Sequence, residues 1–127
     1  MKRLASSPIA FVLTAALLPA PGRAQTTVKL NGPLARLAGG NVESVLVRTQ
    51  GSHCAYLADQ EVDDTLELFG VPLDGSASAL RLNAPLVPGT DVGRGAVISA
   101  DGSRVAFFAG GFTAGVIWSA PSDGSGP

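Results

Sequence analysis

Residues 101–107 read Asp101-Gly102-Ser103-Arg104-Val105-Ala106-Phe107, and a related copy stands earlier in the chain as Gln50-Gly51-Ser52-His53-Cys54-Ala55-Tyr56. In both copies a Gly-Ser turn leads into a short apolar run, which is typical of a tight turn that opens a β-strand. Two more segments recur in the same order. Lys29-Leu30-Asn31-Gly32-Pro33-Leu34 returns as Arg81-Leu82-Asn83-Ala84-Pro85-Leu86, and residues 68–76 (LFGVPLDGS) return as residues 117–125 (IWSAPSDGS). Such self-similarity indicates a repeat architecture, in which each unit buries its apolar face against a neighbour.

The apolar runs between the turns are short and rich in β-branched and aromatic residues, and no segment sustains a helical period, so the sequence predicts strands. The Asp-Gly pairs that recur between the runs supply positive φ for hairpin turns. We therefore expect an all-β fold of antiparallel, four-stranded, up-and-down units, one over about residues 28–82 and one over about 83–125. The predicted strands are 45–47, 54–57, 66–71, 79–82, 96–98, 105–108 and 116–118.

The first 24 residues have the pattern of an export signal. Lys2 and Arg3 precede an apolar run from Ile9 to Leu18, and small residues lead to a cleavage site before Gln25. The run is too short to span a bilayer as a helix. The expected mature chain is residues 25–127, periplasmic or extracellular, with no membrane span after the signal is removed. A retained anchor or a buried helix is the alternative.

Loss of residues 1–24 takes three of the nine basic residues away and leaves all ten acidic ones, so the mature chain carries a net charge of about −4. This charge argues against nucleic-acid binding, which needs a basic face. Cys54 is the single cysteine and cannot form an intramolecular disulfide. Because its counterpart in the repeat is Val105, we expect a small buried apolar position, with a reactive thiol as the alternative.

Ile98-Ser99-Ala100-Asp101-Gly102-Ser103-Arg104-Val105-Ala106-Phe107 resembles the strand-turn-strand signature of TolB-type (WD40-like) β-propeller repeats. Residues 69–75 resemble the next strand and turn of such a blade, and Ala58-Asp59-Gln60 resembles a loop of its exported bacterial members. The resemblance implies antiparallel four-stranded propeller blades, about two and a fraction units, in an incomplete ring, since a closed ring takes about four to eight blades. We therefore expect a fragment or truncated gene product, a chain that associates with copies of itself, or an incomplete sandwich. Ala100 departs from the usual proline, and residues 48–51 lack the Ser-Pro-Asp of the signature.

Two groups of residues contain metal-ligating side chains, but neither has the spacing that a metal site requires. Asp59, Glu61 and Asp63 alternate in the one acidic loop and could offer oxygens to Ca²⁺, but the glycine and glutamate of an EF-hand are missing at the required spacing, which favours a solvated turn. His53 and Cys54 are neighbours, so on a strand they point to opposite faces and cannot share a zinc ion. The sequence predicts no metal site and no cofactor.

Catalytic chemistry finds equally little support. His53 is the single histidine, its counterpart is Arg104, and no Gly-x-Ser-x-Gly elbow accompanies it, so we expect a surface residue rather than a triad member. Residues 110–115 lack the ending of a phosphate loop and are interpreted as a hairpin connection. Trp118 aligns with Phe69, which favours a core or inter-blade contact over ligand stacking.

The expectation is therefore a non-enzymatic, exported repeat protein that acts as a protein-interaction or scaffold module, with an unknown protein partner and possible self-association. Similar repeats form the propeller of some exported serine peptidases, so an orphaned propeller segment of such a hydrolase is the alternative. A truncated gene product without function is a third interpretation.

Overall fold

The computed structural model describes residues 26–35, 39–111 and 115–126. Over these residues the chain forms β-strands and no helix, arranged in two antiparallel sheets. The all-β, antiparallel prediction is confirmed. The predicted signal peptide, residues 1–24, and the middle of the glycine-rich connection, residues 112–114, lie outside the described residues.

The first sheet, sheet A, is a meander of four strands that follow one another in space as in sequence. A bulge in β1 at Glu43 shifts the register between Val42 and Ser44. The strands are β1 (Val42–Leu46), β2 (His53–Ala58), β3 (Glu67–Pro72) and β4 (Leu80–Arg81).

The second sheet, sheet B, is centred on β7 (Arg104–Gly110). β8 (Val116–Pro121) pairs along one edge of β7, while β5 (Asp91–Val92) and β6 (Val97–Ile98) pair with the two ends of its other edge. β5 and β6 thus act as one strand interrupted at residues 93–96. The sequence did not predict β5. Among the described residues, no strand pairs with the free edge of β8.

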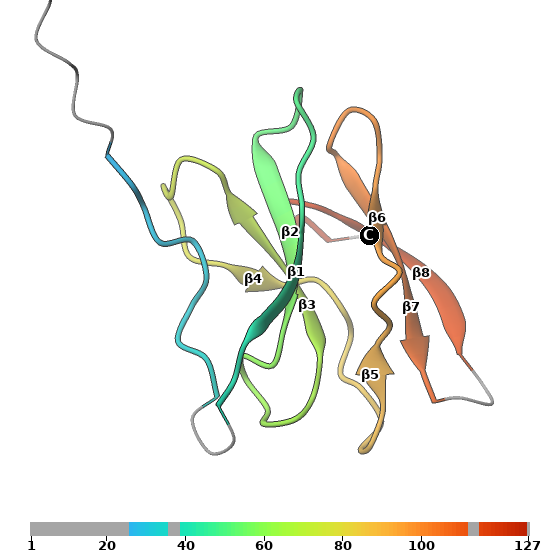
Figure 1. Ribbon diagram of the computed structural model, residues 1–127. Coiled ribbons are helices and arrows are strands. Elements are labelled where there is room, and N and C mark those ends of the chain that lie inside the picture. The colour runs from blue at the N-terminus through green and yellow to red at the C-terminus, as the bar shows by residue number, and fades with distance from the viewer. Residues whose placement is uncertain (1–25, 36–38, 112–114, 127) are drawn as a thin grey trace, which may run out of the picture.

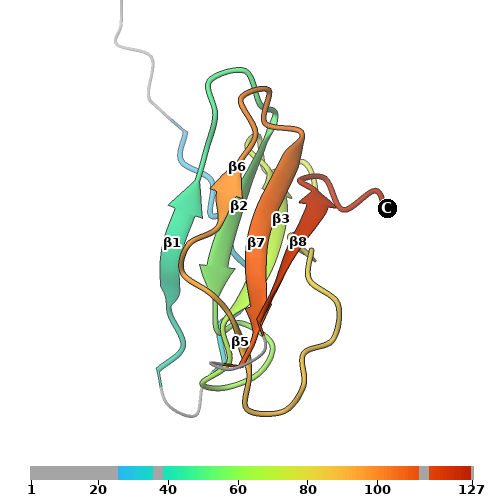
Figure 2. The same ribbon diagram turned by 90° about the vertical axis from the view of Figure 1, so that its right-hand side faces the viewer.

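The two sheets stack face to face, as Figures 1 and 2 show from two directions. We call the faces that meet the inner faces and the opposite ones the outer faces. Alternation along β2 and β7 sorts the apolar side chains between them, because successive residues of a strand point to opposite sides. The core between the inner faces consists of Ala55, Leu57, Leu68, Val92, Ala96, Ile98, Val105 and Phe107.

The outer face of sheet A has a cover of its own, the segment of residues 26–35, which runs along one side of the molecule (blue in Figure 1). Leu30 and Leu34 pack on a second buried cluster there, in which the rings of Tyr56 and Phe69 stack with centroids 5.4 Å apart. The other buried members of this cluster are Cys54, Ala58 and Val71.

Residues 58–60 hold this cover in place. The side-chain carbonyl of Gln60 accepts hydrogen bonds from the Gly32 N–H at 3.1 Å and from the Tyr56 hydroxyl at 2.6 Å. The carbonyl oxygen of Asp59 accepts from the Ala35 N–H, and its carboxylate accepts from the Asn41 N–H. The Ala-Asp-Gln loop therefore has a structural task, which is to fix the N-terminal segment against β2.

The sequence echoes correspond to repeated hydrogen bonds. The Leu73 N–H bonds to the Ser52 carbonyl and the Ser122 N–H to the Ser103 carbonyl, both at 2.9 Å. The side-chain amides of Asn31 and Asn83 likewise both donate to the carbonyl of the next residue. The Asp-Gly turns also match, since Gly75, Gly102 and Gly124 have φ values of 70°, 74° and 72°. Positions in the two sheets can therefore be compared one by one.

Candidate interaction surface

The outer face of sheet B is apolar and open. Register places Val97 beside Ala106, and Phe108 beside Ile117, on the side of the sheet that points away from sheet A. The exposed fractions are 58% for Val97, 43% for Phe108 and 78% for Ile117. The ring of Phe108 lies over Gly93 and Gly115, where added Cβ atoms would come within 3.2 and 1.6 Å of it. We call Val97, Ala106, Phe108 and Ile117 the outer patch.

The free edge of β8 borders a groove of about 480 Å³. Trp118 and Ala120 line one side of the groove, and the connection from β4 to β5, including Leu82 and Leu86, lines the other. The sequence predicts a core or inter-blade contact for Trp118. It is 51% exposed, so it is not a core residue of this chain, and the inter-blade contact stays a prediction. The reason is the missing neighbour: its counterpart Phe69 has Arg81 of β4 beside it, whereas no described strand lies beside Trp118.

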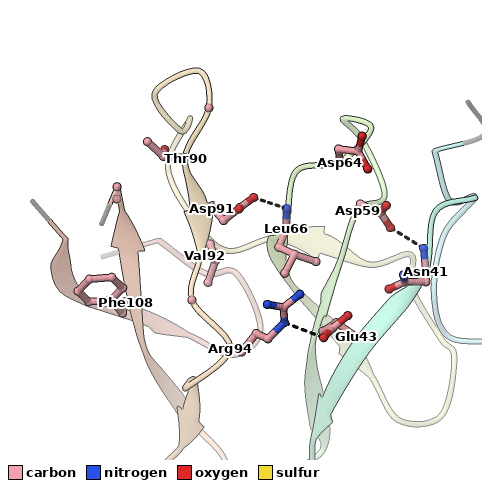
Figure 3. Close-up of a pocket in the computed structure, with 14 residues that line it drawn as sticks. Asn41, Glu43, Asp59, Asp64, Leu66, Thr90, Asp91, Val92, Arg94 and Phe108 are labelled. Carbon is pink, nitrogen blue, oxygen red and sulfur yellow. Dashed lines mark hydrogen bonds and ion pairs between the residues drawn. The ribbon is translucent and has the colours of Figure 1, made fainter. Parts of the chain in front are cut away.

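A second hollow, of about 400 Å³, opens between the sheets at the end of the stack where β5 begins (Figure 3). Four of its charged side chains, those of Glu43, Asp59, Asp91 and Arg94, have protein partners. The Asp91 carboxylate accepts the Leu66 N–H at 2.9 Å, and Arg94 pairs with Glu43 at 2.7 Å between the nitrogen and oxygen atoms. Arg94 lies in the break between β5 and β6 and Glu43 in the β1 bulge, so these polar groups tie the two sheets together.

The acidic loop does not gather its carboxylates at one point. The Asp59 carboxylate accepts a hydrogen bond from the backbone N–H of Asn41. Glu61 forms an ion pair with Arg81 at 2.9 Å, and Arg81 also pairs with the buried Glu67 at 3.0 Å. Within residues 26–35, 39–111 and 115–126, no three His, Cys, Asp or Glu side chains are grouped so as to hold a metal ion.

The opposite end of the stack carries the turns and a polar hollow of about 600 Å³ with His53 and Arg104 in its lining. His53 is half-buried, and its Nδ1 lies 3.0 Å from the Ser52 hydroxyl. Hydrogen bonds from the Ser99 hydroxyl and from the N–H and hydroxyl of Ser103 lower the pKa of Asp101 to about 2. Hydrogen bonds from Ser76 and Ser125 lower the pKa values of Asp74 and Asp123 in the same way. These aspartates stabilise turns.

Cys54 is buried on the outer face of sheet A, as its match with Val105 predicted. Burial raises the pKa of its thiol, and burial likewise raises the pKa of the nearby Tyr56 hydroxyl. A thiol held protonated and away from solvent is a poor nucleophile. Cys54 therefore serves as a packing residue.

The outer patch was missed by sequence reasoning about sites, which looked for polar chemistry. The signal that could have found it is the echo itself: Ile117 matches Leu68 in type, while the chain offers no described segment to cover it. An apolar sheet face with a free edge can bind another sheet or strand but has no group for covalent chemistry.

Comparison of the chain with protein-family models, with characterised proteins and with solved structures gives no match. Among the residues that the structure describes, none lies in a helix long and apolar enough to cross a membrane.

Proposed function

We propose that this chain is an exported, non-catalytic protein-interaction module, built from two repeat units of the TolB-like β-propeller type. The observation that carries the proposal is the outer patch. It presents Val97, Phe108 and Ile117 to solvent from one face of a sheet whose opposite face is packed as core. Contiguous exposed apolar side chains of this kind mark protein-binding surfaces.

The propeller part of the proposal is supported by the way the units relate to each other. Each sheet is an antiparallel meander, successive sheets stack by their faces, and the chain passes from β4 of one sheet to β5 of the next. Propeller blades are stacked, four-stranded antiparallel sheets. Sheet A has four strands in sequence order, and sheet B has three strand positions, formed by β5 with β6, by β7 and by β8. The export part is supported by residues 1–24, whose basic start, apolar run and small-residue cleavage site form a signal-peptide pattern.

The test is photo-crosslinking from the outer patch. A photoreactive phenylalanine analogue replaces Ile117 in the full chain, expressed in a bacterial host that exports it. The matched control carries the same analogue at Val62, which is 51% exposed in the acidic loop. We expect a protein adduct from position 117 that position 62 does not form and that Phe108→Lys abolishes. No protein adduct from position 117, or equal adducts from both positions, would contradict the proposal.

A further inference from the structure

The interface between the sheets is formed by the inner face of sheet A and the inner face of sheet B. In the repeat, the first face matches the outer face of sheet B and the second matches the outer face of sheet A, and both outer faces keep apolar residues exposed. The inner face of sheet A contributes Leu46, Ala55, Leu57 and Leu68. The residues that match them in the repeat are Val97, Ala106, Phe108 and Ile117, which form the outer patch. The outer patch is therefore the same kind of surface as the one that already binds a sheet inside this molecule.

The inner face of sheet B also has an exposed counterpart, on the outer face of sheet A. Ala96 and Ile98, on the inner face of sheet B, are 7% and 5% exposed. Their counterparts Val45 and Val47, at the edge of sheet A, are 58% and 50% exposed. The apolar positions at the edge of sheet A are thus exposed, whereas the matching positions on the inner face of sheet B are covered by sheet A.

The N-terminal segment supplies a third match. In sheet A, β4 pairs with β3, and the buried Asn83 accepts the Leu68 N–H on its side-chain carbonyl at 2.8 Å. Residues 27–31 match residues 79–83, and Ile117 matches Leu68. Yet residues 27–30 form no strand, and among the described residues the side-chain carbonyl of Asn31 accepts no hydrogen bond. This is the piece that the free edge of β8 lacks.

We propose that the two open ends bind each other between copies of this chain, head to tail. The outer patch of one copy packs on the outer face of sheet A of a second copy, whose residues 27–30 join the edge of β8 as its fourth strand. The Asn31 of that copy then accepts the Ile117 N–H. This inference rests on the proposed function, because it names the partner of the same surface.

The second copy is favoured over an unrelated partner because it carries every required element in place. Its Leu30 and Leu34 already lie on the outer face of sheet A, as Leu82 and Leu86 lie between the two sheets. A head-to-tail interface repeats until it closes into a ring or extends into a filament. With two sheets in the described part of each chain, a ring of about four to eight sheets takes roughly two to four copies.

Cross-linking between copies tests the geometry. Inside the molecule, Arg48, which follows β1 of sheet A, donates from Nε to the Ile98 carbonyl of sheet B at 3.2 Å. The matching pair between copies is Ser99 and Val47. Full-length Ser99→Cys and Val47→Cys chains are purified after export and treated with a short thiol cross-linker, separately and mixed. The parent chain, whose Cys54 is buried, is the control. We expect a dimeric adduct only in the mixture. An adduct of Ser99→Cys with itself, or none in the mixture, would overturn the proposal.

Light scattering over a dilution series is the second measurement and does not depend on added cysteines. We expect the parent chain to form a discrete oligomer, Ile117→Lys to be monomeric with unchanged circular dichroism, and the matched Ile117→Leu to associate like the parent. A parent that stays monomeric throughout overturns the inference. The photo-crosslink from position 117 then separates the two claims: an adduct with a different protein keeps the proposed function, and no protein adduct removes both.

Discussion

The inner face of sheet A and the outer face of sheet B carry matching apolar residues with opposite surroundings. Leu57 and Leu68 are fully buried, whereas their counterparts Phe108 and Ile117 are 43% and 78% exposed. Strand register, turns and repeated hydrogen bonds agree between the two units, so the local sequence does not cause the difference. What differs is the next layer: sheet A has sheet B against it. In a stacked fold, a residue belongs to the core because of its neighbouring unit, and an unpaired unit presents its core as a surface.

The sharpest test of this contrast is truncation at the two matched positions. Leu68→Ala removes a buried side chain and is expected to cost about 2–5 kcal/mol in the free energy of unfolding. Ile117→Ala is expected to cost less than about 0.5 kcal/mol at protein concentrations too low for association, since exposed sites contribute little. Urea unfolding followed by circular dichroism measures both. Equal losses at low concentration would mean that the outer patch is already covered within one chain.

Gly70 and Ser119 form the next matched pair. A Cβ on Gly70 would meet the Ser122 carbonyl oxygen at 2.2 Å, so Gly70→Ala is expected to destabilise the chain by about 1–3 kcal/mol. Ser119 has a side chain at the corresponding place in sheet B, where its hydroxyl accepts a hydrogen bond from Arg104. Ser119→Gly should therefore tighten association between copies, because it recreates the flat surface of Gly70. Thermal unfolding and light scattering measure the two effects, and a Gly70→Ala chain as stable as the parent would contradict the first.

The matched residues Asn83 and Asn31 allow the buried and the exposed unit to be compared at one hydrogen bond. Asn83→Ala leaves the buried Leu68 N–H without its acceptor, which is expected to cost about 1–3 kcal/mol. Asn31→Ala should leave the unfolding of the isolated chain nearly unchanged and weaken association instead. Denaturant unfolding and a dilution series, run on both variants, separate these outcomes. Identical behaviour of the two variants would remove the proposed role of residues 27–31.

The smallest expected effect concerns the turns of the β1–β2 and β6–β7 hairpins. Gln50 lies in the β1–β2 turn, and its match in the β6–β7 turn is Asp101. Its folded-state pKa of about 2 lies below the ordinary value of 3.8, so its hydrogen bonds stabilise the folded state above the ordinary pKa. That stability is lost as the pH falls from about 4 through about 2. Asp101→Asn should flatten this part of the pH dependence, because the variant lacks near neutral pH the stability that the ionised carboxylate supplies and is closest to the parent near pH 2. Unfolding midpoints across that range measure it, and parallel curves for parent and variant would contradict the assignment.

Elements with strong local signals were predictable, and elements made by contacts were not. The turns at Gly51-Ser52 and Asp101-Gly102 were predicted because their residues supply the required backbone conformation and recur. β5 was missed because Asp91–Val92 is too short to show an alternating pattern, and its pairing with residues 109–110 comes from the tertiary fold. The alternating carboxylates of the acidic loop suggested a possible Ca²⁺ site, but their partners are distant in sequence: Asp59 binds the Asn41 N–H and Glu61 pairs with Arg81. Exposure of Ile117 was invisible for the same reason, since it depends on what is stacked above it.

The position of Trp118 at the open edge has a spectroscopic consequence. The chain contains one tryptophan, so its indole emission reports on the β8 edge alone, and the one tyrosine, Tyr56, stands on the far side of sheet A. A half-exposed indole emits at long wavelength, and strand addition beside β8 would shift that emission to the blue as water leaves. The unmodified protein thus carries its own optical label at the edge where we expect a fourth strand to be added.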